Sequence, residues 1–549
     1  MTAGELTRQA RTIAVLTAAS RVAGFARTLV FAATVGATAV GSIYQSTNTV
    51  PNVIYEVAAG GILAAATVPL LAGRAAANDR AGTSAVASAL LTWSLVILAP
   101  LTLLVLLLAR PIAGALLDPG ALGADAVDRG ALMLTVFAPQ ILLYGWGIVL
   151  SGVLQAHRRF AAAAAAPLVS SLVVIGTYAA YGLLCPDPGH PTRQALNVLA
   201  WGTTAGVLAM LLTLLPSLAG LGLSWRPRLR FPPGVAARAL HLAGAGLLAL
   251  VAQQVAVLAV VWLSNHRGGP GVLIAYQYAQ ALYLLPYAVL AVPIATAAFP
   301  VLAAAVSETK PPARVGTDRE GLPGAAPDAA AGVLARSLRS ILIVTTAGAA
   351  ALVAAAPDLG GFFSALDRSR SGSGGGALAA LPAALTSMSP GLVGFGAAAL
   401  LVRALYARGP ARRAAGAMAV GWLVAGGLPI LTTLGHNGIR STLIAVGIGS
   451  TTGMTIAALV LAVLVWRAWG PPGLAGAART LLTVAIAAVG STLLLRWGVG
   501  RWWTAPGGGV AGHLVHGLVV GFVPAAVVLA AGRAVSRTSR LSGTTGGPG

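Results

Sequence analysis

Long apolar stretches recur along the chain, separated by short segments that contain glycine, proline or charged residues. A transmembrane helix needs about 20 mostly apolar residues, and each stretch is long enough to supply one. The stretches lie near residues 12–35, 43–73, 82–109, 131–156, 162–184, 195–219, 237–264, 272–303, 331–356, 383–407, 411–434, 440–466, 474–496 and 510–533. This pattern predicts an all-α polytopic membrane protein with about fourteen transmembrane helices.

Composition agrees with this interpretation. Of the 549 residues, 57% are hydrophobic and 9% are charged, against about 25% charged in an ordinary soluble domain. The net charge of +22 raises the alternative of nucleic-acid binding. The basic residues are scattered singly between apolar stretches, however, so we interpret them as topology signals and expect no nucleic-acid partner.

The distribution of basic residues predicts the orientation. With the N-terminus inside, the cytoplasmic segments hold 24 Lys and Arg residues and the external segments hold 9, while Arg21 and Arg27 lie within the first stretch. Cytoplasmic loops of bacterial membrane proteins are enriched in Lys and Arg. We therefore expect a multi-pass protein of the bacterial cytoplasmic membrane with both termini inside.

The chain divides into segments of different character. Residues 1–225 and 226–470 are each expected to form a lobe of six helices, with a cytoplasmic linker at about 304–330 in the second. Residues 471–535 would add helices 13 and 14, and residues 536–549, rich in Gly, Ser and Thr, would form a disordered tail.

A faint internal similarity indicates a duplication. Pro139 opens the fourth stretch as Pro390 opens the tenth, and in the same register Gly145 matches Gly396. Both runs end in an arginine pair, Arg158–Arg159 and Arg412–Arg413. Helices 1–6 and 7–12 are therefore predicted to be parallel repeats, to which helices 13 and 14 are added.

Two arginines inside the first stretch are the main candidates for binding. A charge at the bilayer centre costs about 2.5 to 3.5 kcal/mol, so such residues normally face a cavity or a partner. Arg21 and Arg27 lie about 60° to either side of Gly24 on one helix face, a residue that could also let the helix bend. We favour an anion site for phosphate; the alternatives are an ion pair with Glu56 or snorkelling at the helix end.

A polar stripe follows the second stretch. Its members are Tyr44, Asn48, Asn52, Tyr55 and Glu56, with Pro51 inside it and Gly60–Gly61 after it. Such a stripe lines a cavity or joins helices, and we leave both alternatives open. The proline and the glycine pair predict a bend, and broken helices at membrane depth commonly border a substrate path.

The eighth stretch repeats this arrangement. Polar side chains recur at Tyr276, Gln277, Gln280, Tyr283 and Tyr287, and Pro286 and Pro293 are predicted kinks. The alternative is packing with aromatic residues at the membrane interface.

Motifs for catalysis are missing from the sequence. It has no Walker-type phosphate loop, no histidine pair at metal spacing and no two carboxylates in one apolar stretch. Glu56 is the only acid placed within a predicted span, and His513 and His516 are interpreted as interfacial. The lone Cys185 excludes an internal disulfide. We therefore expect a transporter without metal or cofactor, and leave coupling to an ion or to the membrane potential open.

Four segments resemble the MurJ/MviN lipid II flippases, especially actinobacterial members. They are SRVAGFAR from Ser20, NTVPNVIYEVAAGGILAAATVPLLAG from Asn48, AYQYAQALYLLPYAVLAVPIATAAFPVL from Ala275 and LLVRALYARGPARRAA from Leu400. Gram-negative members carry arginines where this chain has Tyr55 and Glu56, and an Asp-Arg pair where it has Gln280 and Ala281.

The resemblance implies a fold of the multidrug/oligosaccharidyl-lipid/polysaccharide exporter superfamily. Two six-helix lobes would surround a cavity, and helices 13 and 14 would hold a polyprenyl tail. The implied function is flipping of lipid II to the outer leaflet for peptidoglycan synthesis and cell shape, with Arg21 and Arg27 near the pyrophosphate. Expected partners are lipid II, membrane lipids and cell-wall synthesis proteins. The alternatives are export of another lipid-linked glycan and a non-transporting scaffold for cell-wall enzymes.

Overall fold

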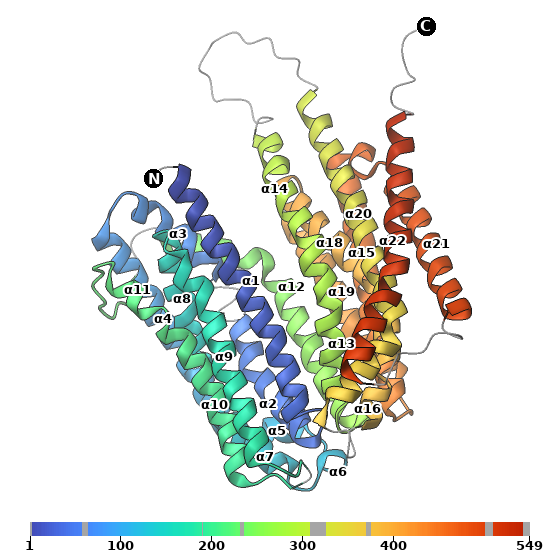
Figure 1. Cartoon of the computed structure of the whole chain (residues 1–549). Helices are drawn as coiled ribbons and strands as arrows, with labels where there is room; N and C mark the ends of the chain where they lie inside the picture. The colour runs from blue at the N-terminus through green and yellow to red at the C-terminus, as the bar shows by residue number, and fades with distance from the viewer. Residues whose placement is uncertain are drawn as a thin grey trace. The chain divides into compact units, whose positions relative to one another are not determined.

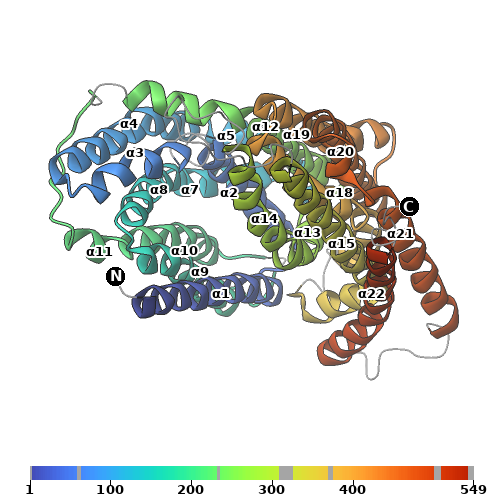
Figure 2. The same ribbon diagram turned by 90° about the horizontal axis from the view of Figure 1, so that it is seen from above.

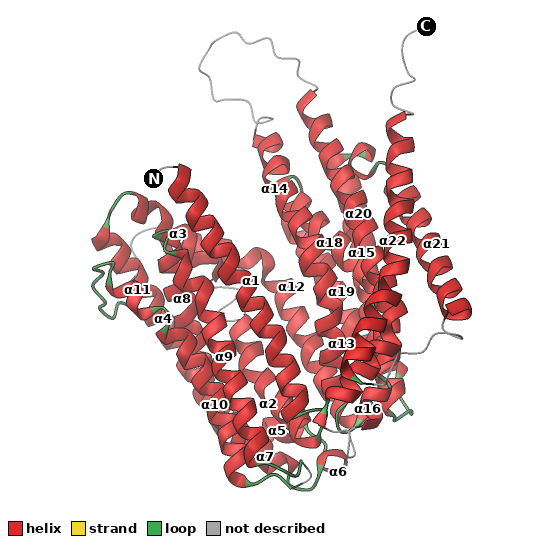
Figure 3. Ribbon diagram, viewed as in Figure 1, coloured by secondary structure: helices red, strands yellow, loops and turns green. Residues whose placement is uncertain are grey.

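The computed structural model describes residues 3–57, 64–188, 190–230, 235–307, 325–368, 375–499 and 509–541. Figure 3 shows helices joined by loops, with no strand in these ranges. The all-α prediction is confirmed.

The chain forms two compact units (Figures 1 and 2), Met1–Ile274 with Leu366–Ala377, and Ala275–Ala365 with Leu378–Gly549. The first unit contains α1 (Ala3–Thr34), α2 (Ala39–Ile54), α3 (Ala64–Ala76), α4 (Arg80–Leu107), α5 (Ala109–Leu116), α6 (Pro119–Leu122), α7 (Ala126–Phe137), α8 (Gln140–Ala156), α9 (Phe160–Leu184), α10 (Arg193–Leu212), α11 (Leu215–Ala219), α12 (Val235–Leu263) and the π-helix η2 (Ser264–Gly268).

The second unit holds most of the remaining helices. They are α13 (Val272–Pro286), η3 (Tyr287–Ala291), α14 (Val292–Ser307), α15 (Ala325–Leu366), α17 (Leu381–Met388), α18 (Gly391–Ala407), α19 (Ala411–Thr432), α20 (Ile439–Trp469), η5 (Pro471–Leu474), α21 (Ala477–Leu494), η6 (Leu495–Val499) and α22 (Val510–Leu541). The short α16 (Gly375–Ala379) follows the segment that joins the first unit.

Most of the predicted spans are present. Within the described residues, twelve helices are long and apolar enough to cross a membrane, and the bent pair Gly376–Met388 and Gly391–Ala407, at 49°, makes a thirteenth if it is one span. The remaining predicted stretch, residues 43–73, contains α2 and α3, but residues 58–63 lie outside the described part. The count of fourteen and the inward termini stay predictions.

The predicted linker and tail are helical where they are described. Residues 304–307 belong to α14 and 325–330 to α15, while 308–324 lie outside the described ranges. The helix α22 continues through residues 536–541 of the predicted tail. The two six-helix lobes stay a prediction, with which α8 and α18 agree: both are 17 residues long and both begin directly after proline.

Side-chain caps determine where several helices begin. Thr38 Oγ1 accepts the N–H of Gly41 at 3.1 Å, and Asp79 Oδ1 accepts that of Gly82 at 2.8 Å. The first N–H groups of a helix have no partner within it, so these caps satisfy them. At the other end of α20, Gly470 has φ +74° and two prolines follow it, which stops the helix.

Each unit packs around an apolar core. In the first, α3, α4 and α8 meet through Leu71, Leu90 and Val153, all buried. In the second, glycines let helices approach: a Cβ on Gly394 of α18 would lie 2.7 Å from the carbonyl of Met454 in α20. Lipid is as apolar as these side chains, so close van der Waals packing holds such helices together.

Candidate functional site

The face of α1 that carries Arg21 and Arg27 is open. Both arginines are exposed, and a Cβ placed on Gly24 between them would meet no atom within 4 Å. No ion pair among the described residues joins Glu56 to either arginine. The alternative of a structural ion pair with Glu56 therefore finds no support among the described residues, while the anion site and snorkelling at the helix end both stay predictions.

An aromatic cluster one turn from Arg27 fixes α1 in place. Phe31 of α1 stacks on Tyr44 of α2 with 5.9 Å between ring centroids and meets Tyr178 of α9 edge-on at 5.2 Å. The hydroxyl of Tyr44 is bonded to those of Tyr178, at 3.0 Å, and Thr203, at 2.9 Å. Arg27 lies one helical turn before Phe31 on α1, so the cluster fixes the part of the helix that carries this arginine.

The polar stripe of α2 has two roles, one at each end. Tyr44 joins helices, as described above. Further along, Asn48 Oδ1 is buried and has no hydrogen-bond partner in the structure, while Asn52 Nδ2 donates to the carbonyl of Asn48 at 2.9 Å. The ring of Tyr55 lies 4.6 Å from that of Tyr144 in α8, and Glu56 is exposed. The second end therefore borders open space.

A cavity of about 290 Å³, mostly apolar but with several polar side chains in its wall, lies at this second end, inside the first unit. Its polar lining comes from α2, α3 and α8: Tyr55, Thr67, Tyr144, Ser151 and Gln155. At roughly 30 Å³ per molecule, the volume corresponds to about ten waters. Sequence reasoning missed Tyr144 and Gln155, because neither belongs to a polar stripe.

The stripe of the eighth predicted helix is mostly packed. Tyr287 stacks on Phe395 of α18 at 4.2 Å, and Tyr283 is buried against the same ring at 6.3 Å. Gln280 Nε2 donates to the hydroxyl of Tyr276 at 3.3 Å. Tyr276, Gln277 and Gln280 are half-buried, and their role in binding stays a prediction.

The predicted kinks coincide with changes of helix type. After Pro286, α13 becomes the π-turn η3, and α14 begins at Val292 with Pro293 in its first turn. Proline cannot donate to the helix ladder and clashes with it, which explains the change of helix type. Residues 55–57 after Pro51 form a similar π-turn. The helix α1 continues through Gly24, and Gly60 and Gly61 lie outside the described residues.

Arg403 is a further cation in a span. It lies in α18, is half-buried and donates to the carbonyl of Ala399 at 2.6 Å. The sequence could have identified Arg403 as a candidate, because it is a single arginine inside the apolar run from Leu400 to Ala407.

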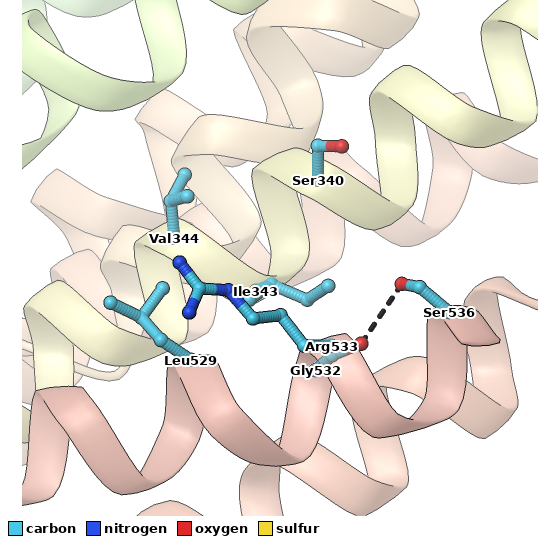
Figure 4. Close-up of a pocket in the computed structure, with 7 residues that line it drawn as sticks. All are labelled: Ser340, Ile343, Val344, Leu529, Gly532, Arg533 and Ser536. Carbon is cyan, nitrogen blue, oxygen red and sulfur yellow. Dashed lines mark hydrogen bonds between the residues drawn. The ribbon is translucent and has the colours of Figure 1, made fainter.

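The second unit holds two pockets that the predicted residues do not line. One is an apolar cavity of about 800 Å³ between α15, α18, α20 and α21, with Arg496 at its wall. The other, of about 400 Å³, lies between α15 and α22, where Figure 4 shows the guanidinium of Arg533 beside Val344 and Leu529. No group of three His, Cys, Asp or Glu that could hold a metal occurs in the described ranges.

One prediction about the acidic residues is wrong. Glu56 is not the only acid in a candidate span, because α15 continues beyond the predicted end at 356 and its candidate span, Ala329–Leu366, contains Asp358. His516 lies within α22, and its Nδ1 is 2.8 Å from Oδ1 of Asp358; its interpretation as an interfacial residue stays a prediction. The contact itself could not be inferred locally, since the two residues are 158 positions apart.

Comparison with known proteins agrees with this fold. A probable lipid II flippase MurJ of Rhizobium tropici is 28% identical over 298 residues, which are 53% of this chain and 54% of that protein. The chain thus spans about half the length of the curated relatives it matches. A solved lipid II flippase MurJ in an inward closed conformation has a TM-score of 0.70 at 16% identity, covering 94% of this chain and 97% of that one.

A second solved structure, an inward-facing multidrug resistance MATE family transporter of the MOP superfamily, has a TM-score of 0.60 at 15% identity over 82% of this chain and 93% of that one. At such identities the structural matches show the fold alone. The family model for the lipid II flippase MurJ, however, matches residues 31–506. This multi-pass protein of the cytoplasmic membrane therefore belongs to the MurJ lipid II flippase family.

Proposed function

We propose that this protein flips lipid II, the lipid-linked peptidoglycan precursor, from the inner to the outer leaflet of the cytoplasmic membrane by alternating access. The observation that carries the proposal is the open arginine face of α1. Arg21 and Arg27 are exposed on a spanning helix, without a carboxylate partner among the described ion pairs. A spanning helix retains such charges where they face water or an anionic ligand.

The chemistry of the substrate suits this face. A pyrophosphate cannot cross hydrocarbon unaided, because removing its charge from water is prohibitive. Two guanidinium groups offer charge-assisted hydrogen bonds to its oxygens, and the cavity in the same unit offers hydroxyl and amide groups from Tyr55, Ser151 and Gln155. An inside-negative potential favours outward movement of an anion by about 2.3 kcal/mol per charge per 100 mV. No resident metal or cofactor is needed for this step.

The test is replacement of a resident flippase. A bacterium depleted of its own lipid II flippase expresses this chain, its Arg27→Ala variant or its Arg193→Ala variant, and lipid II accessible at the outer leaflet is quantified. Arg193 is an exposed arginine at the start of α10 in the same unit, so it controls for loss of positive charge. We expect the wild type and Arg193→Ala to restore outer lipid II and Arg27→Ala to fail at equal membrane abundance.

Each other outcome counts against a defined part of the proposal. If a well-expressed wild type restores nothing in several hosts, lipid II is not the substrate, and another lipid-linked glycan or a scaffold role takes its place. If Arg27→Ala works as well as the wild type, the anion site does not depend on Arg27. Association with cell-wall synthesis proteins stays a prediction.

A further inference from the structure

A basic segment, residues 224–230, lies along α4 in the first unit. It follows α11, and Figure 2 shows it as a green loop that runs from α11 to the side of α4. In one direction, Nε1 of Trp93 in α4 donates to the carbonyl of Leu229 at 2.8 Å. In the other direction, three backbone N–H groups of the segment donate to hydroxyls of α4: that of Ser224 to Ser84 at 3.2 Å, that of Arg226 to Ser88 at 3.2 Å, and that of Arg228 to Thr92 at 3.0 Å.

The spacing of these hydrogen bonds fits a helix on one side and an extended chain on the other. The hydroxyls are four residues apart on α4, which is about 6 Å along a helix. The N–H groups are two residues apart, which is about 6 to 7 Å along an extended chain. Pro227, between two of them, has no N–H that would need a partner. Backbone that lies against lipid must have its polar groups bonded within the protein, and the α4 hydroxyls meet that requirement here.

The position of the segment on α4 indicates its depth. The candidate span of this helix is Arg80–Leu107, and the segment covers its first turns as far as Trp93. Directly beyond Trp93, the side chains of Leu95, Val96 and Ile97 are 41%, 45% and 44% exposed, as expected of residues that face hydrocarbon. The basic segment therefore lies at the level where lipid headgroups meet the acyl chains.

The side chains of the segment suit that level. Arg226, Arg228 and Arg230 are exposed, and none of the described ion pairs involves them. Beside them, Trp225 is 41% exposed and Leu229 is 60% exposed. Tryptophan is enriched where membrane meets water, and arginines next to exposed tryptophan and leucine are typical of segments that lie in the headgroup region.

The two ends of α4 differ in the charges around them. Next to the basic segment, Arg80 begins α4, and Arg159 donates to carbonyls on either side of the end of α11. The acid at this end, Asp79, is bonded to the N–H of Gly82. An excess of arginine is expected at a cytoplasmic end, in agreement with the predicted orientation. Near the other end of α4, two arginines are paired with acids, Arg110 with Asp128 and Arg129 with Asp125.

We propose that the basic segment is a binding surface for anionic phospholipids of the inner leaflet, with its arginines at the phosphate groups and Trp225 and Leu229 at the upper part of the acyl chains. A guanidinium forms charge-assisted hydrogen bonds with phosphate oxygens, and each cation near an anionic leaflet adds attraction. The hydrogen bonds to α4 hold the arginines in a row before a lipid binds, so less conformational freedom is lost on binding. The proposal does not depend on which lipid the protein transports.

The first experiment measures lipid binding directly. The purified full chain in detergent is titrated with phosphatidylglycerol or phosphatidylcholine, and bound lipid molecules are counted by native mass spectrometry. Arg226→Gln/Arg228→Gln removes two charges from the segment, and Arg412→Gln/Arg413→Gln, at the start of α19, removes two exposed charges elsewhere. We expect the tightest phosphatidylglycerol site to weaken about 30-fold in the segment variant and to be unchanged in the control. Equal losses in both variants, or a wild type that does not prefer the anionic lipid, would overturn the proposal.

A second pair of variants separates the position of the arginines from their charge. Ser88→Ala/Thr92→Ala keeps every arginine but removes the acceptors that hold the backbone of the segment on α4. We expect phosphatidylglycerol binding to weaken by about tenfold. Thr102→Ala is the control, because the hydroxyl of Thr102 donates to the carbonyl of Leu98 within α4 itself, at 2.8 Å. Wild-type binding in Ser88→Ala/Thr92→Ala would show that the hydrogen bonds to α4 do not form the surface.

The third experiment tests the depth of the segment. The full chain is placed in nanodiscs that contain both phospholipids, one of them brominated near the top of its acyl chains. The fluorescence of Trp225 is obtained as the difference between the wild type and Trp225→Phe. We expect brominated phosphatidylglycerol to quench it more strongly than brominated phosphatidylcholine. If neither lipid quenches it, the segment lies in water away from the bilayer, which overturns the proposal and leaves an acidic protein as the partner to be sought.

Discussion

The carboxylate of Asp367 accepts the backbone N–H of Ala37, at 2.9 Å to Oδ1 and 3.1 Å to Oδ2, although 330 residues separate the two. The bond lies within the first unit, to which the segment Leu366–Ala377 contributes. Its neighbour Arg368 donates to the carbonyls of Thr34, at 3.0 Å, and Gly182, at 3.2 Å. The segment after α15 thus holds the C-terminal ends of α1 and α9 by hydrogen bonds. The helix α1 is the one that carries Arg21 and Arg27.

Loss of this carboxylate should destabilise the protein. In Asp367→Ala, the buried N–H of Ala37 loses its acceptor, which costs about 1.5 to 3 kcal/mol for a bond to a charged group. We expect a lower thermal midpoint, measured with a thiol-reactive fluorogenic dye, because the single Cys185 is buried in the folded state. Asp367→Asn, which keeps one oxygen acceptor, should lose less; equal losses in both variants would contradict the role of the hydrogen bond.

The contact between α9 and α10 offers a matched pair of glycine-to-alanine changes. A Cβ on Gly202 would overlap the side chain of Thr177, whereas a Cβ on Gly176 would meet nothing within 4 Å. Gly202→Ala should therefore cost about 1 to 3 kcal/mol through overpacking, while Gly176→Ala should be neutral or stabilise by up to about 1 kcal/mol. The same dye assay compares the two variants, and the reverse order would show that α10 is not packed on α9 as described.

The hydroxyl of Tyr44 joins three helices. Tyr44→Phe keeps the ring stacked on Phe31 but removes the bonds to Tyr178 and Thr203, so we expect a loss of about 1 to 2 kcal/mol. Tyr406→Phe, on a side chain that is 47% exposed, is the control and should change little. Thermal midpoints of both purified variants test this, and equal values would show that the buried network contributes nothing measurable.

The π-turn between α13 and α14 should matter more for movement than for stability. Pro286→Ala restores a backbone donor at a position where proline disfavours a regular helix by about 3 kcal/mol. We therefore expect an unchanged or higher thermal midpoint together with slower flipping of lipid II in vesicles. Pro100→Ala, inside α4 of the other unit, is the matched control. If Pro286→Ala flips lipid II at the wild-type rate, the π-turn is not needed for transport.

Much of the architecture could be predicted because each spanning helix is determined by the residues of its own segment. A run of about 20 apolar residues forms a helix in the membrane whatever its neighbours do, since the backbone must satisfy its own hydrogen bonds there. Proline disturbs the helix within one turn of its own position, so the change of helix type after Pro286 was predictable. The position of Arg21 and Arg27 inside the first apolar stretch could also be read from the sequence, and both side chains are exposed on α1.

The site was predicted less completely, because a polar side chain on a spanning helix can equally line a cavity or bind a neighbouring helix. Tyr44 and Tyr55 occupy the same stripe, yet one is bonded to Tyr178 and the other borders a cavity. The residue that faces each of them comes from a helix more than 80 positions away, and no spacing along the chain reveals it.

The sequence by itself determined the class of protein and the location of most spans, because the hydrophobicity of each segment acts through the solvent that surrounds it. Only the tertiary structure decided which polar groups meet: Tyr44 with Tyr178, Asp367 with Ala37, and Asp358 with His516. Such pairs depend on how closely two helices approach, and that distance is set by small residues such as Gly361 and Gly517 acting together from distant parts of the chain.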